Sequence, residues 1–407
     1  MAGLGQEVEP DEAGLDAAAL DRLDRCFADH VDAGRLPGFL LALARDGRIA
    51  HLTTYGRRDV AGGLPVESDT LWRIYSMTKP VTAVAVLLLV EEGRLGLDDP
   101  LERHLPAFAN PRVYEAGSGG GLTTRPAAGP IRIRHLLTHT AGLTFGFYHQ
   151  HPVDALYRDS GLEYSVPPGA DLAETVEVYA RMPLQFEPGT QWNYSVASNV
   201  LGRVIEVVSG RPLDAFLAER ILGPLGMADT GFHLAPGQEP RLAELYRETD
   251  EGGIAPVPGL PVHGRPRFLS GSGGLVSSAY DFHRFMEMLR RGGELDGVRL
   301  LSADGVALMT GNRLPGGAVL RAFGAPVHQE PGNDGLGFGF NVSVVVDPSR
   351  TLAPSSLGAY GWTGAATTAF WVDPAHELTV QFMTQVRPRT LKVFPQLRRL
   401  VSEALAG

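Results

Sequence analysis

Several residue types are scarce in this chain, and each shortage argues against particular structural features or classes of partner. Cys26 is the one cysteine in 407 residues, so no internal disulfide can form and no oxidising compartment is required. We expect Cys26 to serve in packing on the first helix. The longest apolar run, residues 81–90, contains Thr82 and is about half as long as a bilayer span. It therefore predicts a buried helix and no membrane partner.

Positive charge is also scarce. The formal net charge is -10 and the pI is about 5.7, which argues against a nucleic-acid partner, because such proteins usually present a basic face. Residues 1–16 are acidic and lack the apolar core of a secretory signal, so we expect a cytoplasmic protein. Cysteine and histidine show no zinc-site spacing, and His149 and His151 are interpreted as loop or pocket-wall residues. We expect no metal.

Lysine is the scarcest of the charged residues. Only Lys79 and Lys392 occur, and every other cationic side chain is arginine, apart from histidine. Arginine cannot lose its proton near neutral pH, whereas a lysine deprived of water can. The placement of Lys79 at the start of the apolar run indicates a position where a removable proton is needed.

The first hundred residues predict a helix, a hairpin and a second helix. Apolar residues in 16–33 recur at spacings of three and four, which is typical of an amphipathic helix. Two strand-like runs then flank Asp46-Gly47, a strong hairpin signal. The helix that carries Ser76 and Lys79 is expected to end at Gly93.

The middle of the chain differs in composition and in hydrophobic spacing. Residues 116–130 are rich in glycine and proline and predict a loop. Helical spacing follows in three segments, which are 131–143, 171–184 and 197–227. Within the first segment, we interpret His139 as a structural histidine, with Gly142 as the helix C-cap.

The last third returns to strands. Strand-like runs cover 337–347, 363–373 and 377–385, and the tail 391–407 is helical, with Pro395 near its first turn. We therefore predict an α/β (α+β) fold, in which an antiparallel β-sheet is flanked by N- and C-terminal helices. Residues 1–105 and 260–407 would form the α/β sandwich domain, and 106–259 a mainly helical inserted domain.

Ser76 and Lys79 are spaced for chemistry. At positions i and i+3 of a helix they would lie on the same face. Burial lowers a lysine pKa because the charged form loses hydration, and a neutral amine can then accept a proton from a serine hydroxyl. The helix N-terminus adds a positive dipole and free N–H groups for a developing oxyanion. This pair alone is a hypothesis, because a short motif can arise by chance.

Other segments strengthen that hypothesis when they are taken together. Tyr194 stands just ahead of a predicted helix, and Trp362 and Gly364 precede a strand. In this order, the motifs SMTK, YSV and WTG resemble serine hydrolases built like class C β-lactamases, and most closely the family VIII carboxylesterases. Residues 135–143 and 271–281 look like framework stretches of the family that the motifs resemble. The likeness extends over about residues 38–385.

The resemblance implies a role for each matching position. Ser76 would be the nucleophile that forms an acyl-enzyme. Lys79 and Tyr194 would share the proton as a coupled pair, and the sequence leaves open which of them holds it at rest. The backbone N–H groups of Ser76 and Ala365 would form the oxyanion hole. No cofactor is implied.

The third motif departs from the β-lactamase pattern in an informative way. Where those enzymes have K-T-G, this chain has Trp362 followed by Thr363 and Gly364. A tryptophan supplies an apolar wall and one N–H donor in place of a cation. Trp362 and Gly364 are therefore expected to bind neutral, partly apolar acyl groups in preference to anionic substrates.

These observations predict a serine carboxylesterase that acts on small-molecule esters with short or medium acyl chains. An acyltransferase using the same residues remains open, as does a β-lactamase or D-aminopeptidase activity. A protein that only binds acyl ligands is the non-enzymatic alternative. The oligomeric state is not determined by the sequence.

Overall fold

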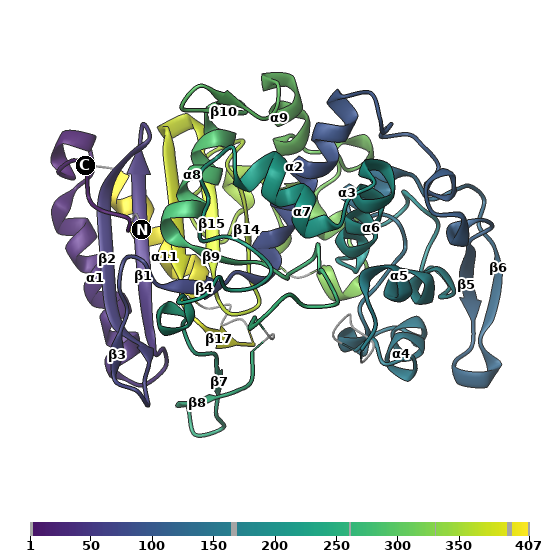
Figure 1. Ribbon diagram of the computed structural model, residues 1–407, viewed down its shortest axis with the longest axis horizontal. Coiled ribbons are helices and arrows are strands. Elements are labelled where there is room, and N and C mark those ends of the chain that lie inside the picture. Colours follow the sequence, from purple (N-terminus) through teal and green to yellow (C-terminus); the bar gives the residue numbers. More distant parts are fainter. Residues whose placement is uncertain (1–2, 164–168, 260–261, 330, 389–392, 406–407) are drawn as a thin grey trace.

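The computed structural model describes residues 3–163, 169–259, 262–329, 331–388 and 393–405 (Figure 1). Its α-helices are α1 (Ala17–Asp32), α2 (Thr78–Glu91), α3 (Ile133–Leu137), α4 (Pro152–Asp159), α5 (Leu172–Ala180), α6 (Ala197–Ser209), α7 (Leu213–Leu217), α8 (Ala279–Arg290), α9 (Ala303–Thr310), α10 (Leu320–Phe323) and α11 (Val393–Leu405).

Most of the strands belong to one sheet and the rest form short pairs. They are β1 (Gly38–Arg45), β2 (Arg48–Asp59), β3 (Leu64–Pro65), β4 (Leu71–Arg73), β5 (Arg112–Ala116), β6 (Thr123–Pro126), β7 (Tyr246–Glu248), β8 (Ile254–Pro256), β9 (Val276–Ser278), β10 (Glu294–Leu295), β11 (Val298–Arg299), β12 (Leu336–Phe338), β13 (Ser343–Val345), β14 (Tyr360–Thr363), β15 (Ala369–Asp373), β16 (Leu378–Met383) and β17 (Val386–Arg387).

Among the described residues, eight strands form an antiparallel sheet in the order β12-β13-β14-β15-β16-β1-β2-β3. The N-terminal strand β1 pairs with β2 on one side and with the C-terminal strand β16 on the other. Both ends of the chain therefore build the centre of the sheet, which confirms the predicted fold class. The β1–β2 hairpin turns at Asp46-Gly47, where both residues have positive φ (49° and 78°), as a tight hairpin turn requires.

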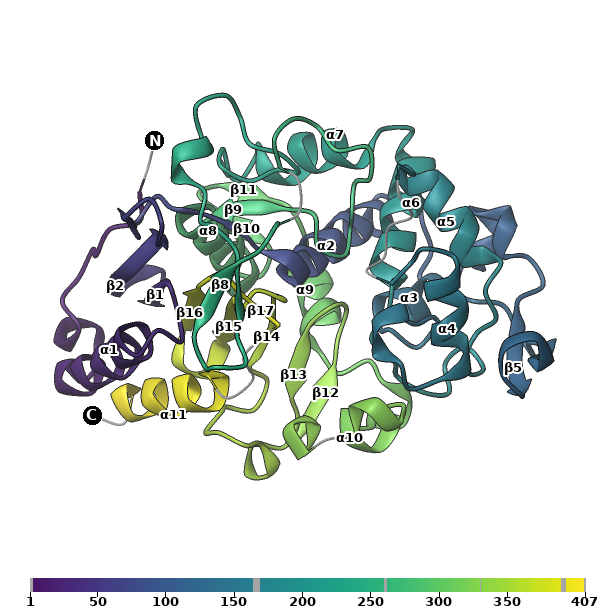
Figure 2. The same cartoon turned by 90° about the horizontal axis from the view of Figure 1, so that it is seen from below.

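The two faces of the sheet pack into different hydrophobic cores, because successive side chains along a strand point to opposite faces. Phe39, Leu41 and Leu43 of β1 pack with α1 and α11, whereas Leu40 and Ala42 pack on the opposite side, where α2 and α8 lie. Figures 1 and 2 show α1 and α11 side by side on the outer face. The predicted first helix and helical tail are thus confirmed.

Helix α2 connects the sheet to the helical part of the molecule. It is buried from Thr78 to Leu89 and packs against α6 and α9. Around α6 gather α3, α5 and α7, and the β5–β6 hairpin lies at the far end from α1 (Figure 1). Gly93 has φ 70° just after the C-cap Glu92, which confirms the predicted stop.

Three local predictions are wrong. The loop predicted at 116–130 contains β6, which pairs with β5 despite its proline and glycine content. The strand predicted at 337–347 is two strands, because Asn341 takes a positive φ of 59° and turns the chain. Helix α3 ends at Leu137 with Thr138 as its C-cap, so Gly142 is not its cap, and His139 itself has φ 55°.

The predicted division at 106 and 259 stays a prediction. Residues 106–259 hold α3 to α7, but β7 within them pairs with β17 near the C-terminus.

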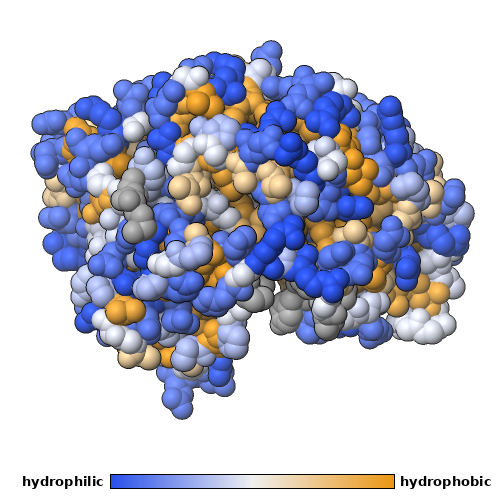
Figure 3. Space-filling model, in the orientation of Figure 1, coloured by the Kyte–Doolittle hydropathy of each residue, from blue (hydrophilic) through white to orange (hydrophobic). Residues whose placement is uncertain are grey.

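Hydrophilic side chains cover much of the face in Figure 3, with apolar ones interspersed. In the part of the chain described here, no helix combines the length and apolarity needed to cross a bilayer.

Candidate active site

Ser76 lies in a turn that leads into α2. A short 3-10 helix, Tyr75–Met77, carries it, so the sequence-based placement of Ser76 on the α-helix itself is corrected by two residues. Tyr75 has φ 45°, a strained value for a bulky residue, while Ile74 and Met77 on either side are fully buried. The buried neighbours hold the turn in place and leave Ser76 half-exposed ahead of the N-terminus of α2.

Lys79 occupies the first turn of α2 and is 1% exposed. Its Nζ donates to the Oγ of Ser76 at 3.1 Å and to the carbonyl oxygen of Ser272 at 2.8 Å. Burial lowers the pKa of Lys79 below its ordinary value, and the nearby Tyr194 opposes part of that shift. The amine is thus biased toward its neutral, proton-accepting form.

The carbonyl of Ser272 was not anticipated from the sequence. The amide of Ser272 donates to Oδ1 of Asn199 on α6 at 3.0 Å, and the hydroxyl of Ser270 donates to the same oxygen at 2.9 Å. Thr82 of α2 donates to the carbonyl of Gly271 at 2.8 Å. Helices α2 and α6 therefore fix the loop that orients Lys79. The stretch 271–281 singled out in the sequence contains Ser272, but nothing in it indicated that its carbonyl would meet Lys79.

Tyr194 comes just before α6, as predicted. Its ring centre is 4.5 Å from Nζ of Lys79, and its hydroxyl accepts a hydrogen bond from Nε1 of Trp362 at 3.3 Å. The hydroxyl of Tyr148 donates to the main-chain carbonyl of Tyr194 at 2.9 Å. The structure thus brings Ser76, Lys79 and Tyr194 together from separate parts of the chain.

His139 supports the segment that carries Tyr194. It is fully buried, and its Nδ1 accepts a hydrogen bond from the amide of Ser195 at 3.2 Å. Its carbonyl accepts from the amide of Asn193 at 2.9 Å. Burial lowers the pKa of His139 well below its ordinary value. A neutral imidazole that bonds to main chain fits the structural role predicted for it.

Trp362 and Gly364 lie at the edge of the same site. Both precede β15, as predicted, but Trp362 itself lies within β14, a strand that was not predicted, and Gly364 follows in the turn to β15. A Cβ on Gly364 would lie 2.6 Å from the carbonyl oxygen of Ile74. Glycine therefore allows the end of β14 to approach the Ser76 turn, and Ala365 packs beside Tyr75.

Aromatic side chains form a wall next to Tyr194. Phe145 and Trp362 have ring centres 5.6 and 5.3 Å from that of Tyr194, and Phe338 meets Trp362 edge-on. Phe147 stacks on Phe145 and is 38% exposed. Phe145 and Phe338 are buried, so the half-buried Trp362 and the exposed Phe147 are the members of this wall that can present apolar surface to a bound molecule.

The two histidines interpreted as loop residues do not approach this site through any contact seen in the structure. His151 is the N-cap of α4, where its Nδ1 accepts from the amide of Val153 at 3.2 Å. His149 lies 3.6 Å from Glu163. Across the described ranges, no three potential metal ligands cluster together.

Comparison with known proteins gives the same family as the motifs. The family model "Beta-lactamase" matches residues 23–404 of the chain. Protein Rv1367c of Mycobacterium tuberculosis is 38% identical over 374 residues, which cover 91% of this chain and 90% of that protein. Esterase EstB of Burkholderia gladioli is 33% identical over 396 residues, which cover 93% of each.

A solved structure shows the same architecture. EstCE1, described as a hydrolase with promiscuous acyltransferase activity, superposes with a TM-score of 0.79 at 27% identity. The match covers 96% of this chain and 98% of EstCE1. The architecture, the family match and the identity to an esterase agree with one another. The chain belongs to the Beta-lactamase family and is an enzyme of its serine hydrolase type.

Proposed function

We propose that this enzyme is a carboxylesterase that hydrolyses esters of short- and medium-chain acids through an acyl-enzyme on Ser76. The observation that carries the proposal is the 3.1 Å contact between the buried amine of Lys79 and the hydroxyl of Ser76. Such a contact activates a serine, because the amine can take the hydroxyl proton as the oxygen attacks.

Acylation begins when Oγ of Ser76 attacks the ester carbonyl carbon. Lys79 and Tyr194 together accept the proton, and the carbonyl oxygen becomes an oxyanion. The backbone N–H groups of Ser76 and Ala365 stabilise that charge, aided by the N-terminus of α2. The ester C–O bond then breaks, and the proton passes from the Lys79–Tyr194 pair to the departing alcohol.

In deacylation, water is the nucleophile and Ser76 is the leaving group. Water takes the place of the alcohol, the Lys79–Tyr194 pair accepts its proton, and the resulting hydroxide attacks the acyl-enzyme carbonyl. The acid leaves and Oγ of Ser76 regains its proton. In this scheme each proton passes through the Lys79–Tyr194 pair, so it calls for no metal or cofactor.

The presence of Trp362 supports the proposal that the substrate is an ester of a neutral acyl group. Its N–H is directed at the hydroxyl of Tyr194, and its ring adds to the aromatic wall formed with Phe145 and Phe338. A lysine in this position would attract an anionic substrate, whereas tryptophan offers apolar contact. The name of EstB, an esterase at 33% identity, points the same way.

A second candidate function is acyl transfer. EstCE1 is described as a hydrolase with promiscuous acyltransferase activity, and its chain matches this one along nearly all its length. Transfer uses the same acyl-enzyme and differs only in the acceptor, which is an alcohol in place of water.

Ser76→Ala should abolish turnover of p-nitrophenyl butyrate, because no other hydroxyl can form the acyl-enzyme. Ser272→Ala is the matched control, since Ser272 contacts Lys79 through its main-chain carbonyl, which alanine keeps. We expect this control to retain activity within a few-fold. Release of p-nitrophenol measures both variants, and full activity in Ser76→Ala would show that the nucleophile is a different residue.

Tyr194→Phe should lower kcat by about 10²–10⁴-fold, the usual contribution of a proton-transfer group. Tyr148→Phe is the control, because it removes a hydroxyl that donates to the main-chain carbonyl of Tyr194 and leaves the Tyr194 phenol in place. We expect it to lose less than about tenfold, an effect on positioning alone. If kcat falls by the same factor in the two variants, the phenol of Tyr194 does not take part in proton transfer.

The rate should fall on the acid side of the pH profile. Protonation of Lys79 removes the proton acceptor, and burial places its pKa below the ordinary 10.5, so kcat/KM should fall as pH drops through that lowered pKa. Lys79→Arg, which keeps the charge but cannot release a proton, should be inactive from pH 5 to about 9. An active Lys79→Arg enzyme would contradict this mechanism.

Added alcohol distinguishes hydrolysis from transfer. With p-nitrophenyl butyrate and no alcohol, an esterase releases butyrate and p-nitrophenol in equal amounts over many turnovers. With added benzyl alcohol, we expect butyrate to remain the main product and benzyl butyrate to form as a minor one by chromatography. A burst of one p-nitrophenol per enzyme without turnover in water, relieved by alcohol, would identify a transferase.

A further inference from the structure

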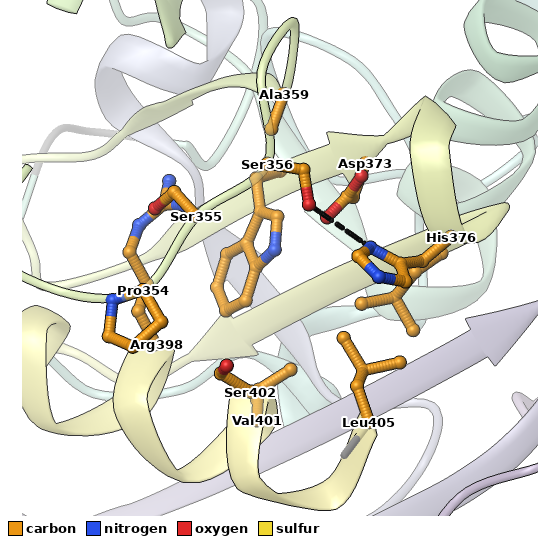
Figure 4. A pocket seen from close by; sticks show the side chains of 12 residues that line it. Pro354, Ser355, Ser356, Ala359, Asp373, His376, Arg398, Val401, Ser402 and Leu405 are labelled. Carbon is orange, nitrogen blue, oxygen red and sulfur yellow. Dashed lines mark hydrogen bonds and ion pairs between the residues drawn. The ribbon is translucent and has the colours of Figure 1, made fainter. Parts of the chain in front are cut away.

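A second pocket lies on the far side of the sheet from Ser76. It has a volume of about 260 Å³ and is bounded by β15, the segment before β14, and α11 (Figure 4). Trp371 on β15 lines it and pairs with Gly361, whereas the neighbouring pair is Trp362 with Phe370. Because successive residues on a strand face opposite ways, Trp371 and Trp362 lie on opposite faces. The pocket is therefore separate from the active site.

Arg398 is the cation of this pocket. Its guanidinium lies over the ring of Trp371, with 4.6 Å from the central carbon to the ring centre. Within the described residues no acceptor within hydrogen-bond or ion-pair distance faces it, and Asp373 acts on it only at longer range. Desolvation lowers the pKa of Arg398 to about 10, which still leaves it charged at neutral pH. A guanidinium held over an indole ring, with its N–H donors bonded to none of the described protein groups, is available to an anion.

The opposite wall contains the carboxylate of Asp373, which already has hydrogen-bond partners in the protein. The hydroxyl of Ser356 donates to Oδ2 of Asp373 at 2.6 Å, and His376 Nδ1 lies 3.0 Å from both of those oxygens. Figure 4 shows this group on one side of the pocket and Arg398 on the other. The cluster is no second catalytic triad, because one histidine nitrogen meets both partners and Asp373 itself accepts from the serine.

The remaining walls are largely apolar. Leu378 of β16 and Val401 and Leu405 of α11 line the pocket, with the hydroxyl of Ser402 beside them. The volume is below that of most drug-sized sites, so the ligand must be small. A phosphate dianion would meet Asp373 with additional negative charge and would leave the apolar walls without contact.

We propose that this pocket binds a small monocarboxylate, with its carboxylate on Arg398 and its apolar body against Leu378, Val401 and Leu405. The planar guanidinium matches a carboxylate in two parallel hydrogen bonds. Acids released by ester hydrolysis belong to this chemical class. The binding itself does not depend on the proposed esterase activity and is tested without it.

Titration calorimetry with sodium benzoate tests the proposal on the full chain. We expect saturable binding to the wild type, at least tenfold weaker in Arg398→Gln. Arg399→Gln is the matched control, because Arg399 is the next residue on α11 and is exposed, where it pairs with Glu403. It should bind benzoate like the wild type. Ser402→Tyr, which fills the pocket and leaves Arg398 intact, should also weaken binding at least tenfold.

Neutral benzamide and inorganic phosphate complete the test. Both should bind at least tenfold more weakly than benzoate. Equal binding of benzamide would show that Arg398 does not select charge, and equal binding of phosphate would replace the monocarboxylate with a general anion. No benzoate binding to the wild type, or binding that neither Arg398→Gln nor Ser402→Tyr weakens, would overturn the proposal. Thermal melts of each variant confirm that a loss of binding occurs in folded protein.

Discussion

The contact between a buried amine and a serine hydroxyl is the constraint around which this active site is built. Lys79 has no carboxylate within ion-pair distance among the described residues, and its Nζ donates instead to a carbonyl and a hydroxyl. An unpaired buried charge is costly, so this environment favours the neutral amine. Arginine could not serve here, and the rarity of lysine elsewhere in the chain agrees with a position where the removable proton matters.

The fold supplies that environment from parts that are distant in sequence. Helix α2 carries Lys79 into the interior, α6 holds the loop that presents the Ser272 carbonyl, and the segment before α6 places Tyr194 over the amine. The sheet adds Trp362, whose approach depends on Gly364 having no side chain. Because these elements share one continuous apolar core, a displacement in any one of them would be felt at Ser76.

The two faces of the sheet carry different chemistry. On the α2 side, an aromatic wall and a buried amine suit a neutral ester in the proposed reaction. On the α11 side, the Arg398 guanidinium lies over an indole ring, in a small pocket that has Asp373 on one wall and Leu378, Val401 and Leu405 on another. Neighbouring strands serve the two sites: β14 places Trp362 on the α2 side, and β15 places Trp371 and Asp373 in the pocket on the α11 side.

The sequence by itself indicated the fold class through hydrophobic period and turn chemistry, and the Ser76–Lys79 pair through spacing, because these are local properties. The family and the addition of Tyr194 came from the resemblance of the ordered motifs SMTK, YSV and WTG. The sequence placed the Asp46-Gly47 turn and both terminal helices correctly. It missed the β5–β6 pairing, the break at Asn341 and the end of α3, where tertiary contacts override local propensity. The Ser272 carbonyl, the support from His139 and the Arg398 pocket were decided only by tertiary structure, since each joins residues whose proximity no local pattern encodes.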